Sequence, residues 1–301
     1  LALRAYEAAA VKSKETLSLL NIGQGTIISI GLVVLMAMAA SGNLLALAED
    51  GPSLRLLHAD DPAFEKIWTP PAAVTVVTAS TATELVAFGC ADGSVWIWGA
   101  TRDLPPKRVG TLAGAVTQLG MGQRERWLVA GGKGGDVWRL AIAGSEQTKA
   151  LFKLPGEITA LGPTGNTSFV AAGDALGNVA CEGVSEKENL PVTRLHESSV
   201  TALAVGTSHG TPILVSAGGA RDLRVRWTDL TTRAPAKTAL ESAGAVRRIV
   251  MTRAADAAVV VNADASVRMW RQGAEGALTV RKPQRARFLA LSTQGRCMAV
   301  K

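Results

Sequence analysis

Histidine is the side chain best suited to proton transfer and metal binding near neutral pH, and this chain contains three of them. None of His58, His196 and His209 belongs to an H-x-x-x-H pattern or lies beside a cluster of carboxylates. No serine falls in a G-x-S-x-G turn, and the three cysteines include no C-x-x-C pair. These residue types therefore predict neither a catalytic nucleophile nor a metal centre, and we expect no enzymatic activity and no bound cofactor.

One segment nevertheless carries four residues whose types suit a buried hydrogen-bond network. We call them the polar set: His196, Ser216, Asp222 and Trp227. His196 precedes an alternating apolar stretch, Ser216 ends an apolar run, and Asp222 lies in a turn before a third strand that contains Trp227. A buried imidazole needs a partner for each ring nitrogen, and an indole N–H needs an acceptor. We therefore predict a structural role for the polar set.

Three strands separated by turn residues must position the polar set, and the third strand recurs along the chain. Its copies end at Leu57, Trp98, Leu140, Glu182, Trp227 and Trp270. Neighbouring copies end 41 to 45 residues apart. One small sheet cannot bury both of its faces, so a repeat of this period is typical of sheets that stack on one another.

With this period and the polar set, residues 43–301 resemble the WD-repeat β-propeller family. The resemblance implies an all-β fold with six blades of four strands each, and a seventh, incomplete blade is the alternative. The blade at 43–70 lacks a first strand in this pattern. We expect strand 286–293 to pair with it and to close the ring, because sharing a strand protects both sheet edges.

The N-terminal segment has a different composition. Residues 16–48 contain no charged side chain, and about 20 apolar residues are enough to cross a bilayer as a helix. We therefore expect a single hydrophobic α-helix within residues 1–42, with a transmembrane span over about 19–40. The basic residues before this span favour a membrane anchor with the propeller on the non-cytoplasmic side.

Residues 3–42 also resemble the ATM-type family of ABC half-transporters, at the end of an intracellular helix and the fifth membrane helix. Members of that family export glutathione-linked species, and their N-x-G-Q motif lines the substrate site. The resemblance implies that Asn21 and Gln24 are candidate substrate contacts, since polar side chains in a membrane helix need partners. In the alternative interpretation Asn21 lies at the membrane boundary and is solvated. The chain has no other long apolar run and no G-x-x-x-x-G-K-[ST] phosphate loop.

The formal net charge of +7 comes mainly from the C-terminal part of the chain. Residues 247–301 hold eleven Lys and Arg but only three Asp and Glu. Because these charges are interleaved with apolar strand residues, the pattern is typical of a solvated strand face. We therefore do not expect nucleic-acid binding.

The sequence thus predicts a non-catalytic protein-interaction scaffold, in which rigid blades hold loops that bind protein partners. A membrane tether through residues 19–40 accompanies this hypothesis. Two alternatives stay open. The first is a fragment of an ATM-type ABC exporter of glutathione conjugates or metal-related species, joined to a propeller. The second is an artificial or chimeric junction at 42/43, where the transporter resemblance ends and the blade pattern begins, and in that case we expect a cytoplasmic protein. The sequence predicts neither the partner nor the oligomeric state.

Overall fold

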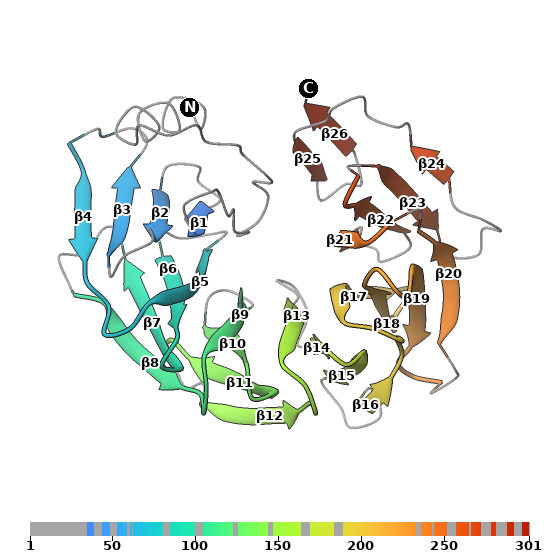
Figure 1. Cartoon of the computed structure of the whole chain (residues 1–301), viewed down its shortest axis with the longest axis horizontal. Coiled ribbons are helices and arrows are strands. Elements are labelled where there is room, and N and C mark those ends of the chain that lie inside the picture. The colour runs from blue at the N-terminus through green and yellow to red at the C-terminus, as the bar shows by residue number, and fades with distance from the viewer. Residues whose placement is uncertain are drawn as a thin grey trace. The chain divides into compact units, whose positions relative to one another are not determined.

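The computed structural model of the chain is shown in Figure 1. It describes residues 35–38, 44–48, 53–58, 61, 63–80, 85–99, 105–122, 126–143, 147–163, 169–183, 189–232, 236–242, 244–251, 257–264, 266–271, 278–280, 288–291 and 297–300. The regular elements in these ranges are β-strands.

The described strands form six antiparallel sheets of four strands and one sheet of two strands. The first three sheets contain β1 (Leu35–Met38), β2 (Leu44–Ala48), β3 (Leu54–His58) and β4 (Glu65–Trp68); β5 (Val74–Ala79), β6 (Leu85–Cys90), β7 (Ser94–Gly99) and β8 (Lys107–Thr111); β9 (Val116–Met121), β10 (Trp127–Gly132), β11 (Asp136–Ala141) and β12 (Lys149–Lys153). The next three contain β13 (Ile158–Pro163), β14 (Val170–Asp174), β15 (Asn178–Glu182) and β16 (Leu190–Arg194); β17 (Val200–Ser208), β18 (Thr211–Gly218), β19 (Arg224–Asp229) and β20 (Lys237–Glu241); β21 (Val246–Met251), β22 (Ala257–Asn262), β23 (Val267–Arg271) and β24 (Leu278–Val280). The two-stranded sheet pairs β25 (Phe288–Leu291) with β26 (Cys297–Val300).

The strands belong to two compact units, one of residues 1–130 with 140–148 and one of residues 131–139 with 149–301. In the first unit, β5 contacts both β1 and β9. In the second unit, β17 contacts both β13 and β21 in the same way (Figure 1). Within each unit these four-stranded sheets therefore meet their neighbours through the first strand of four, which is the packing of blades in a β-propeller.

Glycines in the second strands make this close packing of neighbouring sheets possible. A Cβ atom added to Gly173 would lie 2.5 Å from the Cβ of Val200, on the first strand of the next sheet. The same contact recurs in the first unit, where a Cβ atom on Gly89 would lie 2.5 Å from that of Val116. Only a residue without a side chain leaves room for the valine, so these glycines set the distance between the sheets.

Threonines in the first strands add a hydrogen bond across the same interfaces. The Oγ1 hydroxyl of Thr159 donates to the carbonyl oxygen of Val200 at 2.7 Å, and that of Thr75 donates to Val116 O at 2.5 Å. The hydroxyls also lie near their own second strands, at Gly173 O and Gly89 O. Each threonine thus satisfies a backbone carbonyl of the adjacent sheet.

The predicted all-β propeller fold is therefore confirmed by the described residues. The third strand of each predicted blade corresponds to one of β3, β7, β11, β15, β19 and β23, with the strand ends close to those expected. The buried positions are mostly Val, Leu, Ile and Ala, and in β3 they alternate with less buried residues.

The predicted pairing of strand 286–293 with the blade at 43–70 would join segments of the two different units, and it stays a prediction. In the structure the first-strand position of that blade is taken by β1, whose Leu35–Met38 pair antiparallel with Ala48–Leu45 of β2. Phe288–Leu291 pair with Cys297–Val300. The predicted blade begins at residue 43 and so leaves out the apolar segment Leu35–Met38, which supplies its first strand.

The N-terminal predictions fall mostly on residues outside the described ranges. Asn21, Gln24 and most of the expected span at 19–40 are among them. The part of that span that the structure describes, Leu35–Met38, is a strand and not a helix. In the described ranges no helix has the length and apolar character needed to cross a membrane.

Candidate functional site

The structure brings three members of the polar set together in the sheet of β17 to β20. The Nε2 atom of His196 lies 2.9 Å from Ser216 Oγ, and its Nδ1 atom lies 3.0 Å from Asp222 Oδ2. All three residues are buried. The backbone N–H of Glu197 donates to the same Asp222 oxygen at 3.1 Å. The Asp222 carboxylate therefore ties the loop before β17 to the turn between β18 and β19.

Trp227 does not join this network, and Arg226 takes the fourth place. In the antiparallel register Ser216 faces Arg226, so these two side chains lie on one face of the sheet and Trp227 lies on the other. Arg226 Nη1 donates to Asp222 Oδ2 at 2.7 Å. The indole of Trp227 instead packs against the ring of Trp270, with 5.9 Å between centroids. The prediction of an indole hydrogen bond in the polar set is wrong for this reason.

The spacing within the third strand explains the error. Trp98 follows the turn residue Asp92 by six positions, whereas Trp227 follows Asp222 by five. The residue six positions after Asp222 is Thr228, which is 4% exposed and whose Oγ1 has no hydrogen-bond partner within the described residues. The position equivalent to the buried Trp98 is thus held by Thr228 in this blade.

The Arg226 cation also changes the titration of the network. Burial and the positive charge of Arg226 lower the pKa of His196, against the opposing effect of Asp222. Burial acts to raise the pKa of Asp222, but hydrogen bonds from Arg226, Glu197 N and His196 outweigh it and lower the pKa to about 2. The folded state at neutral pH therefore holds a neutral imidazole beside a carboxylate–guanidinium ion pair.

A second anchored turn lies between β14 and β15 of the preceding sheet. The fully buried carboxylate of Asp174 accepts hydrogen bonds from Gly156 N, Leu176 N and Asn178 N at 2.8 to 2.9 Å. Gly177 in this turn has φ of +89°, and a Cβ atom there would lie 2.1 Å from His196 O. Its carbonyl oxygen accepts the His196 N–H at 3.0 Å. The turn is therefore held directly against the loop that contains His196.

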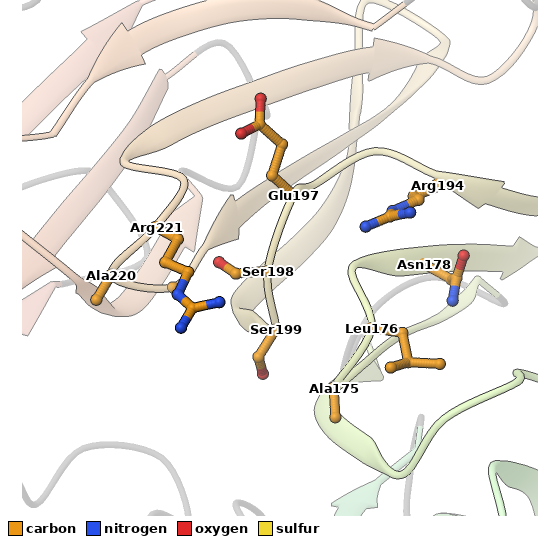
Figure 2. Close-up of a pocket in the computed structure, with 10 residues that line it drawn as sticks. Ala175, Leu176, Asn178, Arg194, Glu197, Ser198, Ser199, Ala220 and Arg221 are labelled. Atoms are coloured by element: carbon orange, nitrogen blue, oxygen red, sulfur yellow. The ribbon is translucent and has the colours of Figure 1, made fainter.

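These three fixed segments surround a pocket of about 520 Å³ in the second unit. Its lining residues come from the β14–β15 turn, the 194–199 loop and the β18–β19 turn: Ala175, Leu176, Asn178, Arg194, Glu197, Ser198, Ser199, Gly219, Ala220 and Arg221. Figure 2 shows the guanidinium groups of Arg194 and Arg221 directed from opposite sides toward the space between the turns. The hydrogen bonds of Asp222 with His196 and Glu197 N join the 194–199 loop to the β18–β19 turn and so fix two walls of this pocket.

The pocket lining is basic and contains polar groups with spare hydrogen-bond capacity. Neither Arg194 nor Arg221 has an acidic partner in the part of the chain that the structure describes; the Arg194 Nε lies 3.4 Å from His196 O. The carboxylate of Glu197 is 3.5 Å from Arg224. The Ser198 hydroxyl has no partner within the described ranges. This arrangement can bind an anionic group by charge and hydrogen bonding.

The other two histidines lie away from this pocket. The ring of His58 packs edge-on against Phe64 at 5.8 Å, and His209 lies in the hairpin turn of β17 and β18 with φ of 48°. In the described ranges no three His, Cys, Asp or Glu side chains form a group able to hold a metal ion.

Sequence reasoning missed the pocket and the role of Arg226. Two signals were available: the five-residue spacing from Asp222 to Trp227, and Arg221 directly before Asp222 in the same turn. The three segments around the pocket belong to two sheets. Predicting the pocket therefore requires the register of both sheets, and the sequence pattern does not determine that register.

The comparisons with known proteins support the fold. No family model matches the chain. Among solved structures, the chain is similar to one in the crystal structure of the mitotic checkpoint complex, with a TM-score of 0.67 and 16% sequence identity over 95% of this chain and 93% of that chain. That chain is a WD40 propeller. At this identity the similarity shows a shared fold.

Proposed function

We propose that this protein is a protein-interaction scaffold and that its docking region is the surface formed by the β14–β15 turn, the 194–199 loop and the β18–β19 turn. The observation that carries the proposal is that buried polar groups fix all three segments while their outer side chains are exposed. A rigid support with exposed variable loops is the usual form of a binding surface. The similar chain in the mitotic checkpoint complex belongs to a protein assembly, which agrees with this role.

Two exposed leucines on these turns supply apolar area for a partner. Leu176 is 53% exposed on the first turn and Leu223 is 36% exposed on the other. Covering apolar surface contributes roughly 25 cal/mol per Å², so two leucines flanking polar groups are suited to an interface. The arginines between them would add orientation and specificity.

Affinity capture from cell extract with matched surface variants tests the proposal. We expect stoichiometric partners to bind the wild-type chain, and their recovery to fall at least about tenfold with Leu176→Asp and Leu223→Asp, since a charge at an interface core costs roughly 1.4 kcal/mol or more. Ile67→Asp is the control, because Ile67 is 57% exposed on β4, outside the docking region. Recovery that is unchanged in both leucine variants would contradict the proposed docking region.

The membrane tether at 19–40, the transporter-fragment alternative with Asn21 and Gln24, and the junction at 42/43 stay predictions from the sequence. The described residues favour none of them, although the strand at Leu35–Met38 makes part of the segment before 42 a component of the first blade. The two possible locations, on the non-cytoplasmic side of a membrane or in the cytoplasm, follow from these alternatives.

A further inference from the structure

The two arginines of the pocket differ from the neighbouring arginines because they have no acidic partner among the described residues. Arg194 and Arg221 both line the pocket, and neither forms an ion pair within the described residues. By contrast, the neighbouring Arg224 is 3.5 Å from Glu197, and Arg226 is 2.7 Å from Asp222. Within the described residues Glu197 and Asp222 are thus already paired with other arginines, whereas Arg194 and Arg221 have no carboxylate partner.

We propose that the pocket binds the carboxylate of an Asp or Glu side chain in an extended, acidic segment of the protein partner, with an aliphatic neighbour packed on Leu176. This inference rests on the proposed docking function and names the chemistry of the partner. A guanidinium group presents parallel N–H donors that match the two oxygens of a carboxylate. The Ser198 hydroxyl, which lacks a partner in the described structure, adds a further donor.

The charge of the pocket favours a single carboxylate. Its lining carries Arg194 and Arg221 and one acidic residue, Glu197, whose carboxylate lies 3.5 Å from Arg224. A carboxylate monoanion places less negative charge beside Glu197 than a phosphate dianion does. The lining also contains no aromatic residue, which disfavours stacked bases of a nucleic acid. Ala175 and Leu176, which lie side by side on one wall of the pocket, suit an aliphatic side chain next to the acid (Figure 2).

A peptide array probed with the full purified chain tests the inference. The array carries random ten-residue peptides with a fixed central Glu-Leu pair, and matched sets with Gln-Leu, Glu-Ser and phosphoserine-Leu pairs. We expect the Glu-Leu set to bind best, and the strongest members to lose about tenfold in affinity with Arg194→Gln or Arg221→Gln, the effect of a lost charged hydrogen-bond pair. Arg247→Gln removes the same charge from an exposed site on β21 outside the pocket and should leave binding unchanged.

The outcomes separate this inference from the proposed function. Equal binding of the Glu-Leu and Gln-Leu sets, stronger binding of the phosphoserine set, an equal loss with Arg247→Gln, or no binding by any set would each overturn the acidic-segment proposal. If any of these occurs while the leucine variants still abolish partner capture, the docking region stands and only its chemistry is wrong. If partner capture is also insensitive to the leucine variants, both proposals fail.

Discussion

The Nδ1 atom of His196 lies 3.0 Å from Oδ2 of Asp222, and this contact joins the loop before β17 to the turn between β18 and β19. The same Nδ1 atom lies 2.9 Å from Arg226 Nη1. A carboxylate can only accept and a guanidinium can only donate, so the imidazole can satisfy one of them at a time. With a proton on Nδ1 it donates to Asp222, and without one it accepts from Arg226, while the Ser216 hydroxyl adapts to either tautomer.

The lowered pKa of Asp222 predicts an acid-dependent loss of stability. Its carboxyl has a pKa of about 2 in the folded protein against a value of 3.8 for the free group. Above about pH 5 the ionised carboxyl of Asp222 contributes its full stabilisation. As the pH falls, this carboxyl is protonated in the unfolded chain at a higher pH than in the folded protein, so the unfolding free energy decreases. We expect the fall in unfolding free energy between about pH 5 and pH 2 to be about 2 kcal/mol smaller in Asp222→Asn than in the wild type.

Urea unfolding at several pH values, followed by tryptophan fluorescence, measures this difference. Asp136→Asn is the control, because Asp136 is 3.2 Å from an exposed Lys153 and such surface pairs contribute little. Parallel pH profiles for the wild type and Asp222→Asn would show that the Asp222 ion pair does not stabilise the fold.

The register of the third strands predicts unequal roles for two tryptophans. Trp98 is 5% exposed at the sixth position after its turn residue, whereas Trp227 is half-buried on the other face of its sheet. We expect Trp98→Ala to reduce the unfolding free energy by about 3–5 kcal/mol, as for a large core side chain, and Trp227→Ala to reduce it by about half as much or less. Chemical denaturation compares the two, and a larger loss for Trp227→Ala would be inconsistent with the register described for β19.

The buried hydroxyl of Thr228 predicts a stabilising substitution. Its Oγ1 is enclosed and has no partner in the described ranges, so the folded state leaves one polar group unsatisfied. Thr228→Val keeps the shape and removes this group, and we expect the unfolding free energy to rise by about 1 kcal/mol. Thermal and urea unfolding both measure the effect. As a control, Thr231→Val should lower stability slightly, because the Thr231 hydroxyl donates to Asp229 at 2.7 Å. A loss of stability in Thr228→Val would mean that the hydroxyl has a partner in solution.

The packing of Val200 against Gly173 predicts strong sensitivity to added volume. A Cβ atom at Gly173 would lie 2.5 Å from two side-chain carbons of Val200, so Gly173→Ala must push the neighbouring sheets apart. We expect a loss of about 1–3 kcal/mol, typical of overpacking. Gly99→Ala is the matched control, because nothing lies within 4 Å of the position of its Cβ atom, and its effect should stay within about 0.5 kcal/mol. The double variant Gly173→Ala, Val200→Ala should recover part of the loss, and a loss unrelieved by Val200→Ala would point to another cause.

The sequence predicted the blades well because each blade repeats one strand pattern at a constant period. Turn chemistry and alternation are local properties, so third strands such as Ser94–Gly99 could be placed to within about a residue. The role of Trp227 could not be predicted in the same way, because two neighbouring positions of a strand face opposite sides and a spacing shorter by one residue exchanges them. The period could also have revealed two further features, the threonines and glycines that repeat at intervals of 42 residues, such as Thr75, Thr117 and Thr159.

The N-terminal strand and the pocket were harder to predict for different physical reasons. An apolar stretch without charges is compatible with a membrane helix and with a buried strand, so Leu35–Met38 could not be assigned by hydropathy alone. The pocket depends on contacts between turns of two sheets. Its decisive contact, Gly177 against His196, joins residues whose proximity follows from the packing of the sheets and not from their spacing in the chain.

The central claim is that a protein partner docks on the turns around the pocket, and site-specific photo-crosslinking tests it most directly. The photoreactive residue p-benzoylphenylalanine replaces Leu176 in one protein and Ile67 in another, and each is irradiated in cell extract. We expect a discrete crosslinked partner for the Leu176 position, lost when Arg194→Gln and Arg221→Gln are combined with it, and no such product for the Ile67 position. Crosslinking at Ile67 alone, or no product at either position, would contradict the proposed docking.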